Sequence, residues 1–127
     1  GHNATDLAIQ MREDRNREDF CVEVSQTCAG QNLAVKTFRE LLIQGKVVIE
    51  ESPLVLWCLQ NAIEIQNNYG DIKLSKRHKD DTERIDPLAA AMNALARLLV
   101  REKTGDIRLE AIFPGIRERE KGINVRI

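Results

Sequence analysis

In three separate stretches of the chain, apolar residues recur at the spacing of one helical face. This spacing of i, i+3, i+4 and i+7 is typical of amphipathic helices. It predicts helices over 3–15, over 32–44 and from Asp86 to about Arg101. Gly45 follows the second stretch, where a glycine commonly ends a helix. The three apolar stripes are Ala4, Leu7, Ala8 and Met11; Ala34, Phe38, Leu41 and Leu42; and Leu88, Ala91, Met92, Leu95 and Leu99.

A further helix is predicted from the signal at its start. Ser52 is a suitable N-cap, and Pro53 fits the first helical position because an amide hydrogen is not needed there. Beyond them, one helical face collects apolar residues and a single amide, which predicts a deeply buried helix. The residues on this face are Leu54, Trp57, Cys58, Asn61, Ala62 and Ile65.

Short segments rich in β-formers predict strands between and after these helices. A turn rich in Asn and Gly spans 67–71, and residues 76–84 contain no apolar side chain, as expected of a solvated loop. Helices that alternate with strands indicate an α/β layer domain. The predicted strands cover 19–24, 47–50, 72–74 and 107–113.

The composition is that of a folded protein with one hydrophobic core. The 127 residues suffice for one domain, and 43% of them are apolar. The net charge of −1 gives no overall attraction to nucleic acid, so any such surface must be local. The apolar runs are too short for a membrane span or a signal peptide, and we expect a soluble intracellular protein with reduced thiols. The cysteines, in no metal-binding spacing, are Cys21, Cys28 and Cys58.

Candidate chemistry is concentrated in one charged segment. The chain has no glycine-rich nucleotide loop, and His2 and His78 are too far apart to indicate a nucleophilic site. In the charged segment, carboxylates that could hold Mg²⁺ alternate with cations that could bind phosphate. Two other interpretations stay open, a solvated charged face and a helix-capping role for Asp86. The acids are Asp80, Asp81, Glu83 and Asp86, and the bases are Lys73, Lys76, Arg77, Lys79 and Arg84.

Several separated motifs stand in an order that resembles a known family. They are Ser52-Pro-Leu-Val-Leu-Trp57 with Asn61, Asn68-Tyr-Gly-Asp-Ile-Lys73 with Lys76, Arg84-Ile-Asp-Pro-Leu-Ala-Ala90, and Met92-Asn-Ala-Leu95. Together, over about residues 2 to 100, they resemble the nuclease domain of the large terminase subunit of tailed phages.

The resemblance implies an RNase H-like fold and a two-metal endonuclease that cuts concatemeric viral DNA, joined to an N-terminal ATPase motor. It implies that Asp86 is an acidic ligand of Mg²⁺ or Mn²⁺ and that Lys76 is a basic residue at the site. Trp57 and Asn61 match a structural helix near the site, where a buried amide must find hydrogen-bond partners and could fix the adjacent loop. The expected DNA-binding residues are Lys73, Arg77, Lys79 and Arg84.

The resemblance also implies partners and a location. The partners are double-stranded DNA, the portal protein and the small terminase subunit, in the cytoplasm of a bacterial host and without a membrane. Residues 1–105 correspond to the C-terminal part of the nuclease domain, and 106–127 to a final strand and a charged tail. Within that tail, 116–123 resembles a portal-docking end, although charged termini are commonly mobile.

The match departs from the family pattern at the start of the chain. A second acidic ligand would immediately precede Gly1, and the first strands of the fold would be lacking, so one metal-binding acid remains. We therefore expect that this piece alone neither cleaves DNA nor binds metal tightly, and that unpaired strand edges allow it to form homo-oligomers. The alternative is a non-catalytic prophage remnant or a module that binds DNA or portal. A resolvase or transposase is less well supported by the helix of Trp57 and Asn61.

Overall fold

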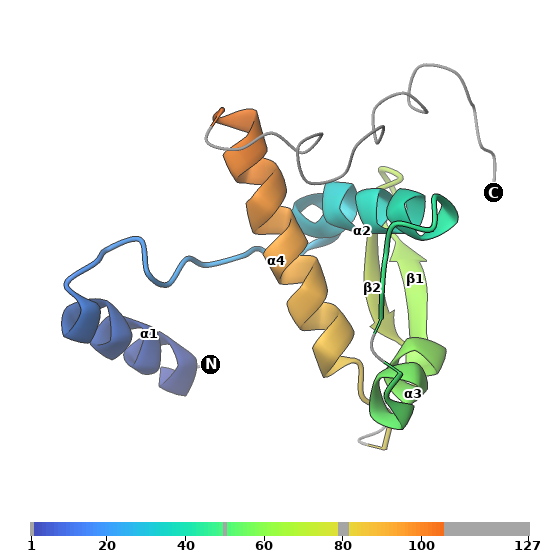
Figure 1. Cartoon of the computed structure of the whole chain (residues 1–127), viewed down its shortest axis with the longest axis horizontal. Coiled ribbons are helices and arrows are strands. Elements are labelled where there is room, and N and C mark those ends of the chain that lie inside the picture. Colours follow the sequence, from blue (N-terminus) through green and yellow to red (C-terminus); the bar gives the residue numbers. More distant parts are fainter. Residues whose placement is uncertain (1, 50, 79–81, 106–127) are drawn as a thin grey trace.

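The computed structural model describes residues 2–49, 51–78 and 82–105 of the chain, and it combines helices with one small sheet (Figure 1). This mixture agrees with the α/β class at a coarse level, while the sheet within the described residues is a two-stranded antiparallel hairpin. The elements in chain order are α1 His2–Arg15, α2 Cys28–Ile43, α3 Pro53–Asn61, β1 Ala62–Gln66, β2 Ile72–Lys76 and α4 Asp86–Lys103.

The hairpin is fixed by its turn. β1 and β2 pair from Ala62 opposite Lys76 to Gln66 opposite Ile72. The side-chain oxygen of Asn67 accepts the amide hydrogens of Tyr69 at 3.0 Å and Asp71 at 2.9 Å, so this residue closes the turn on itself. Gly70 adopts a φ of +86°, which other residues rarely adopt. The predicted turn is confirmed.

The core lies where α2 packs against the hairpin on one side and against α4 on the other (Figure 1). One cluster joins α2 to α4 and the other joins α2, β2 and α4. The four buried apolar positions of α4 follow the predicted stripe, and burial of such side chains is the main stabilising term of the fold. The two clusters are Ala34, Leu41, Leu95 and Leu99, and Val35, Ile72, Leu88 and Met92.

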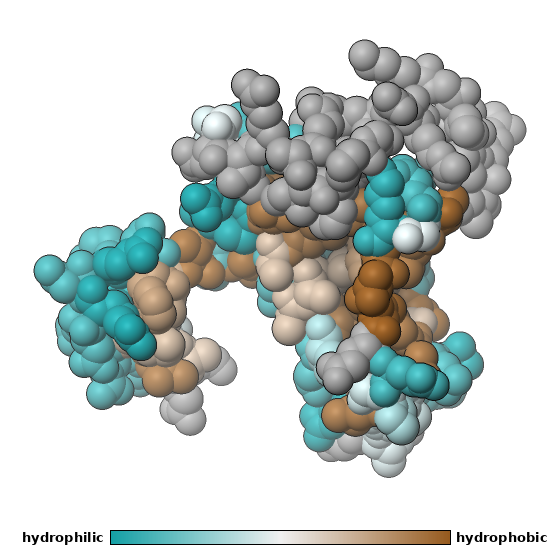
Figure 2. Space-filling model, in the orientation of Figure 1, coloured by the Kyte–Doolittle hydropathy of each residue, from teal (hydrophilic) through white to brown (hydrophobic). Residues whose placement is uncertain are grey.

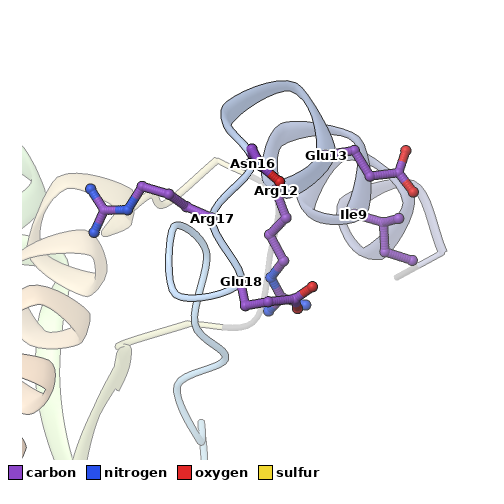
Figure 3. Close-up of a pocket in the computed structure, with 6 residues that line it drawn as sticks. All are labelled: Ile9, Arg12, Glu13, Asn16, Arg17 and Glu18. Atoms are coloured by element: carbon purple, nitrogen blue, oxygen red, sulfur yellow. The ribbon is translucent and has the colours of Figure 1, made fainter.

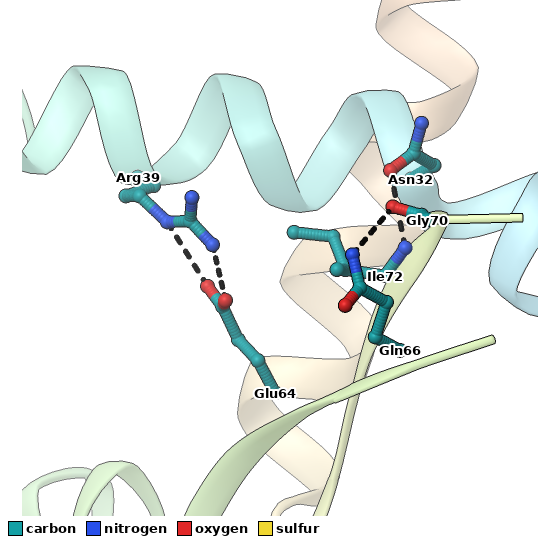
Figure 4. A network of polar contacts seen from close by, with 6 residues as sticks. All are labelled: Asn32, Arg39, Glu64, Gln66, Gly70 and Ile72. Atoms are coloured by element: carbon teal, nitrogen blue, oxygen red, sulfur yellow. Dashed lines mark hydrogen bonds and ion pairs between the residues drawn. The ribbon is translucent and has the colours of Figure 1, made fainter. Parts of the chain in front are cut away.

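Polar contacts also fasten α2 to the hairpin (Figure 4). The side-chain oxygen of Asn32 accepts the amide hydrogen of Ile72 at 3.1 Å, which satisfies a backbone group at the start of β2. Arg39 donates to both carboxylate oxygens of Glu64 on β1, with the Nε–Oε1 pair at 3.0 Å. Hydrogen bonding to Glu64 raises the pKa of Arg39 above its ordinary value. The sheet and α2 therefore form one unit.

Helix α1 stands apart from this unit (Figure 1). Its outer side is hydrophilic, and an apolar strip lies on the side that faces the rest of the chain (Figure 2). On this helix Leu7 remains 56% exposed and Met11 37% exposed. The guanidinium of Arg12 donates to the backbone oxygen of Cys21, which ties the helix to the segment that follows it. The predicted helix is confirmed, but its apolar stripe is not buried.

A hollow of about 290 Å³ lies between the end of α1 and the next loop, lined by the six side chains of Figure 3. Arg17 points away from the helix there, toward Asp19, and the hydrogen bond from Arg17 lowers the pKa of the Asp19 carboxyl. Because both groups are fully exposed, solvent screens this pair.

Two of the predicted strands do not form within the described chain. Residues 19–24 and 47–49 have no ladder partner, and a strand is stable only when another strand accepts its backbone hydrogen bonds. Residue 50, the predicted strand 107–113 and the tail 106–127 lie outside the described residues.

The prediction for α3 was wrong in length and in burial. The backbone leaves the helix at Ala62, with φ −82° and ψ 137°, so Ala62 and Ile65 belong to β1. Only Cys58 and Asn61 of this helix are buried, and Trp57 is 38% exposed. Ser52 is the N-cap as predicted, although its side chain makes no capping hydrogen bond.

The three cysteines are free thiols, and no helix of the described chain is long and apolar enough to cross a membrane.

Candidate active site

Asp86 lies at the first position of α4, at the end of the loop that leaves β2. Ile85 is the N-cap of this helix, with φ −133° and ψ 16°, and no side chain caps it. The helix-capping interpretation of Asp86 is therefore wrong, since the residue lies inside the helix instead of before it. Its carboxylate is exposed. It stands at the helix end where the macrodipole favours negative charge, and its exposure makes it accessible to a cation from solvent.

Asn61, at the end of α3, holds both ends of the loop that precedes Asp86. Its backbone oxygen accepts the amide hydrogen of Arg77 at 2.9 Å. Its side-chain Nδ2 donates to the backbone oxygen of Arg84 at 3.3 Å. Asn61 itself is 9% exposed, and its buried side-chain amide has a hydrogen-bond partner, as the sequence predicted, although that partner belongs to the exposed Arg84. We call this pair of contacts the loop neck.

A second pair of contacts closes the loop just beyond the loop neck. One carboxylate oxygen of Glu83 accepts the backbone amide hydrogen of His78 at 2.8 Å, and the other lies 2.7 Å from His78 Nδ1. Glu83 is thus engaged within the loop and differs from Asp86, whose carboxylate is exposed. Lys79, Asp80 and Asp81 lie outside the described residues.

The basic residues divide into two groups. Lys76, the half-buried last residue of β2, and the exposed Arg77 and Arg84 flank the loop neck at the end where Asp86 lies. Lys73 lies earlier on β2, and its ammonium donates to the backbone oxygen of Gln26 at 3.1 Å, next to the start of α2. Of the four candidate DNA-binding residues, the structure therefore brings Arg77 and Arg84 to one end of the hairpin and leaves Lys73 at a different place, while Lys79 lies outside the described residues.

Trp57 lies one helical turn before Asn61 on α3, and it is half-exposed. The deep burial expected of it is therefore wrong, and its structural role near the site stays a prediction. The contact between Glu83 and His78 was not predicted from the sequence. Its only signal was an acid and a histidine five positions apart within the charged run 76–84.

Asp86 is suited to a hard divalent cation. The described residues hold no cluster of three or more acids, cysteines and histidines that could bind a metal ion. Mg²⁺ commonly keeps several waters and takes one or two carboxylates from the protein. An exposed Asp86 carboxylate fits such a water-rich site as one of its oxygen ligands.

Comparison with known proteins gives one family. The family model for the terminase large subunit endonuclease domain matches residues 2–102, which is most of the chain. No curated protein and no solved structure matches it. The chain belongs to the terminase large subunit endonuclease family.

Proposed function

Taking this family as the premise, we propose that the chain is part of a metal-dependent endonuclease that cuts concatemeric viral DNA during packaging. The observation that carries the proposal is the exposed Asp86 at the start of α4, two residues after Arg84, at the end of the hairpin where Asn61 holds the main chains of the exposed Arg77 and Arg84. An anionic metal ligand next to cationic phosphate-binding groups is the combination that phosphodiester hydrolysis requires. The fold in this proposal is RNase H-like, and the hairpin β1–β2 with α2 and α4 forms part of it.

Asp86 would hold Mg²⁺ or Mn²⁺, and bound metal would supply Lewis-acid chemistry for the attacking water and the leaving oxygen. The protein's own residues then have separate tasks. Arg77 and Arg84 bind backbone phosphates and orient the duplex, as such contacts do without reading sequence. Lys76 supplies positive charge at the end of β2, and Lys79, which lies outside the described residues, is proposed as a DNA-binding residue from the sequence alone.

The DNA surface in this proposal is local. The whole chain carries a net charge of −1, so it has no general attraction to nucleic acid. Cations near the loop neck are therefore the groups expected to bind the duplex. The small terminase subunit and the portal protein are the further partners we propose, in the cytoplasm of a bacterial host.

We further infer that the 127-residue chain does not cut DNA alone. Two metal ions need more than one carboxylate, and Asp86 is the acid to which the motif order assigns a ligand role. The chain would then supply one part of the metal site. The alternative, a non-catalytic module that binds DNA or portal, keeps the same basic surface and needs no metal at Asp86.

A DNA-binding titration tests the basic surface. We expect Arg84→Ala to weaken binding of the chain to a fluorescent duplex about three- to tenfold and to reduce the salt dependence by about one charge. The matched control is Arg101→Ala, an exposed arginine near the other end of α4, which should leave affinity unchanged. Equal effects of both substitutions would contradict a surface at the loop neck.

A plasmid-nicking assay with Mn²⁺ tests the catalytic assignment. We expect no nicking by the chain alone at any metal concentration tested. Nicking that is lost in Asp86→Ala would support the endonuclease and contradict the inference that the chain is inactive. Nicking that persists in Asp86→Ala would contradict the role of Asp86.

A further inference from the structure

We propose that Asn61 is a positioning residue for Asp86, acting through the backbone oxygen of Arg84. This inference rests on the proposed role of Asp86 as a metal ligand. It assigns the side-chain amide of Asn61 a task beyond packing, because the amide fixes the residue that leads into the first turn of α4.

The contact lies close to the carboxylate along the chain. The Arg84 oxygen that accepts from Asn61 Nδ2 is two residues before Asp86. Between them lies Ile85, whose backbone oxygen accepts the amide hydrogen of Ala89 at 2.9 Å and so begins the helical ladder. Fixing the Arg84 backbone therefore restricts the orientation of the first turn of α4, and so the orientation of the Asp86 side chain.

Asn61 is itself well anchored for this purpose. It lies at the junction of α3 and β1 and is buried. Its backbone oxygen accepts from Arg77, whereas its side chain reaches Arg84. Because the Arg77 contact uses the main chain, a substitution at Asn61 removes the Arg84 contact and leaves the other end of the loop held.

The chemistry of the contact favours an amide at this position. A carbonyl oxygen needs a hydrogen-bond donor, and the amide of Asn61 remains a donor at every pH of interest. A carboxylate of the same size has no hydrogen to donate and would place two acceptors against each other. The contact of Glu83 with His78 closes the loop independently, so loss of the Asn61 contact should loosen the start of α4 without opening the whole loop.

Amide hydrogen exchange of the 127-residue chain, followed by NMR, tests the positioning role. In Asn61→Ala we expect the Ala89 amide to exchange about five- to tenfold faster, while the amides of Leu95 and Leu99 are unchanged. The control is Asn68→Ala at the exposed hairpin turn, which should alter neither. Asn61→Asp provides a variant of equal size that loses the donor without leaving a cavity, and it should loosen Ala89 at least as much.

A Mn²⁺ titration of the same variants separates positioning from general destabilisation. We expect Mn²⁺ to broaden the signals around residue 86 at about threefold higher concentration in Asn61→Ala than in the parent chain. Unchanged exchange and unchanged Mn²⁺ affinity in both Asn61 variants would overturn the positioning role while leaving the metal role of Asp86 intact. Absence of Mn²⁺ broadening near residue 86 in the parent would overturn both. Equal acceleration at Ala89, Leu95 and Leu99 would show a purely structural role and overturn the proposal.

Discussion

Helices α1 and α4 share the same apolar spacing in the sequence and differ in what their stripes contact. In α4 the stripe packs against α2 and β2, and Met92 is 2% exposed. In α1 the stripe points toward the body without joining its core, and Leu7 is 56% exposed (Figure 2). The same pattern thus predicts helix formation in both, whereas burial depends on a facing surface that the pattern does not contain.

The two helices also differ in what stabilises them. An isolated helix as short as α1 is marginal in water, and most helical stability in proteins comes from packing of the apolar face. The helix is held locally by Arg12, which donates to the Cys21 oxygen. The unit of α2, the hairpin and α4 therefore determines the free energy of unfolding, and α1 contributes little to it.

The largest effect expected from this comparison is in the core. We expect Met92→Ala to lower the free energy of unfolding by about 3 kcal/mol, because it removes buried methylene groups and leaves a cavity. The matched change on α1, Leu7→Ala, should alter it by less than about 0.5 kcal/mol, as exposed substitutions do. Urea unfolding followed by circular dichroism measures both. Equal losses would show that α1 belongs to the cooperative core.

A smaller difference is expected between two arginines. Arg39→Ala should lower the free energy of unfolding by about 0.5–1 kcal/mol, since it removes a partly exposed ion pair that joins α2 to β1. Arg12→Ala removes contacts within the α1 segment and should leave the global unfolding transition within error. The same urea titration applies, and a larger loss for Arg12→Ala than for Arg39→Ala would contradict the independence of α1.

Local signals in the sequence predicted the elements whose structure is local. Gly45 and the Ser52-Pro53 pair marked helix ends correctly, and Gly45 has a φ of +65°. The strand β1 was missed because its short apolar run fits two periods. Ala62 and Ile65 continue the helical face of Asn61, yet they also lie on a strand where Ile63 and Ile65 alternate with Glu64 and Gln66. Pairing with β2 favours the strand over the helix, and no local sequence pattern contains that contact.

The residues 19–24 illustrate the opposite error. Their β-rich sequence predicts a strand, but propensity alone cannot supply a neighbour, and in the described chain they remain unpaired. The sequence likewise predicted only part of the candidate site. The sequence placed Asp86 at a helix start and required partners for the Asn61 amide. The contact of Glu83 with His78 depends on loop closure, which spacing does not determine.

The most direct measurement is a Mn²⁺ titration of the isotope-labelled chain, followed by paramagnetic broadening of its amide signals. If Asp86 is a metal ligand, broadening will centre on residues 84–90, disappear in Asp86→Asn and persist in Asp6→Asn, a matched acid exposed on α1. Broadening that persists in Asp86→Asn, or that is lost equally in Asp6→Asn, would contradict the assignment of Asp86 to the metal site.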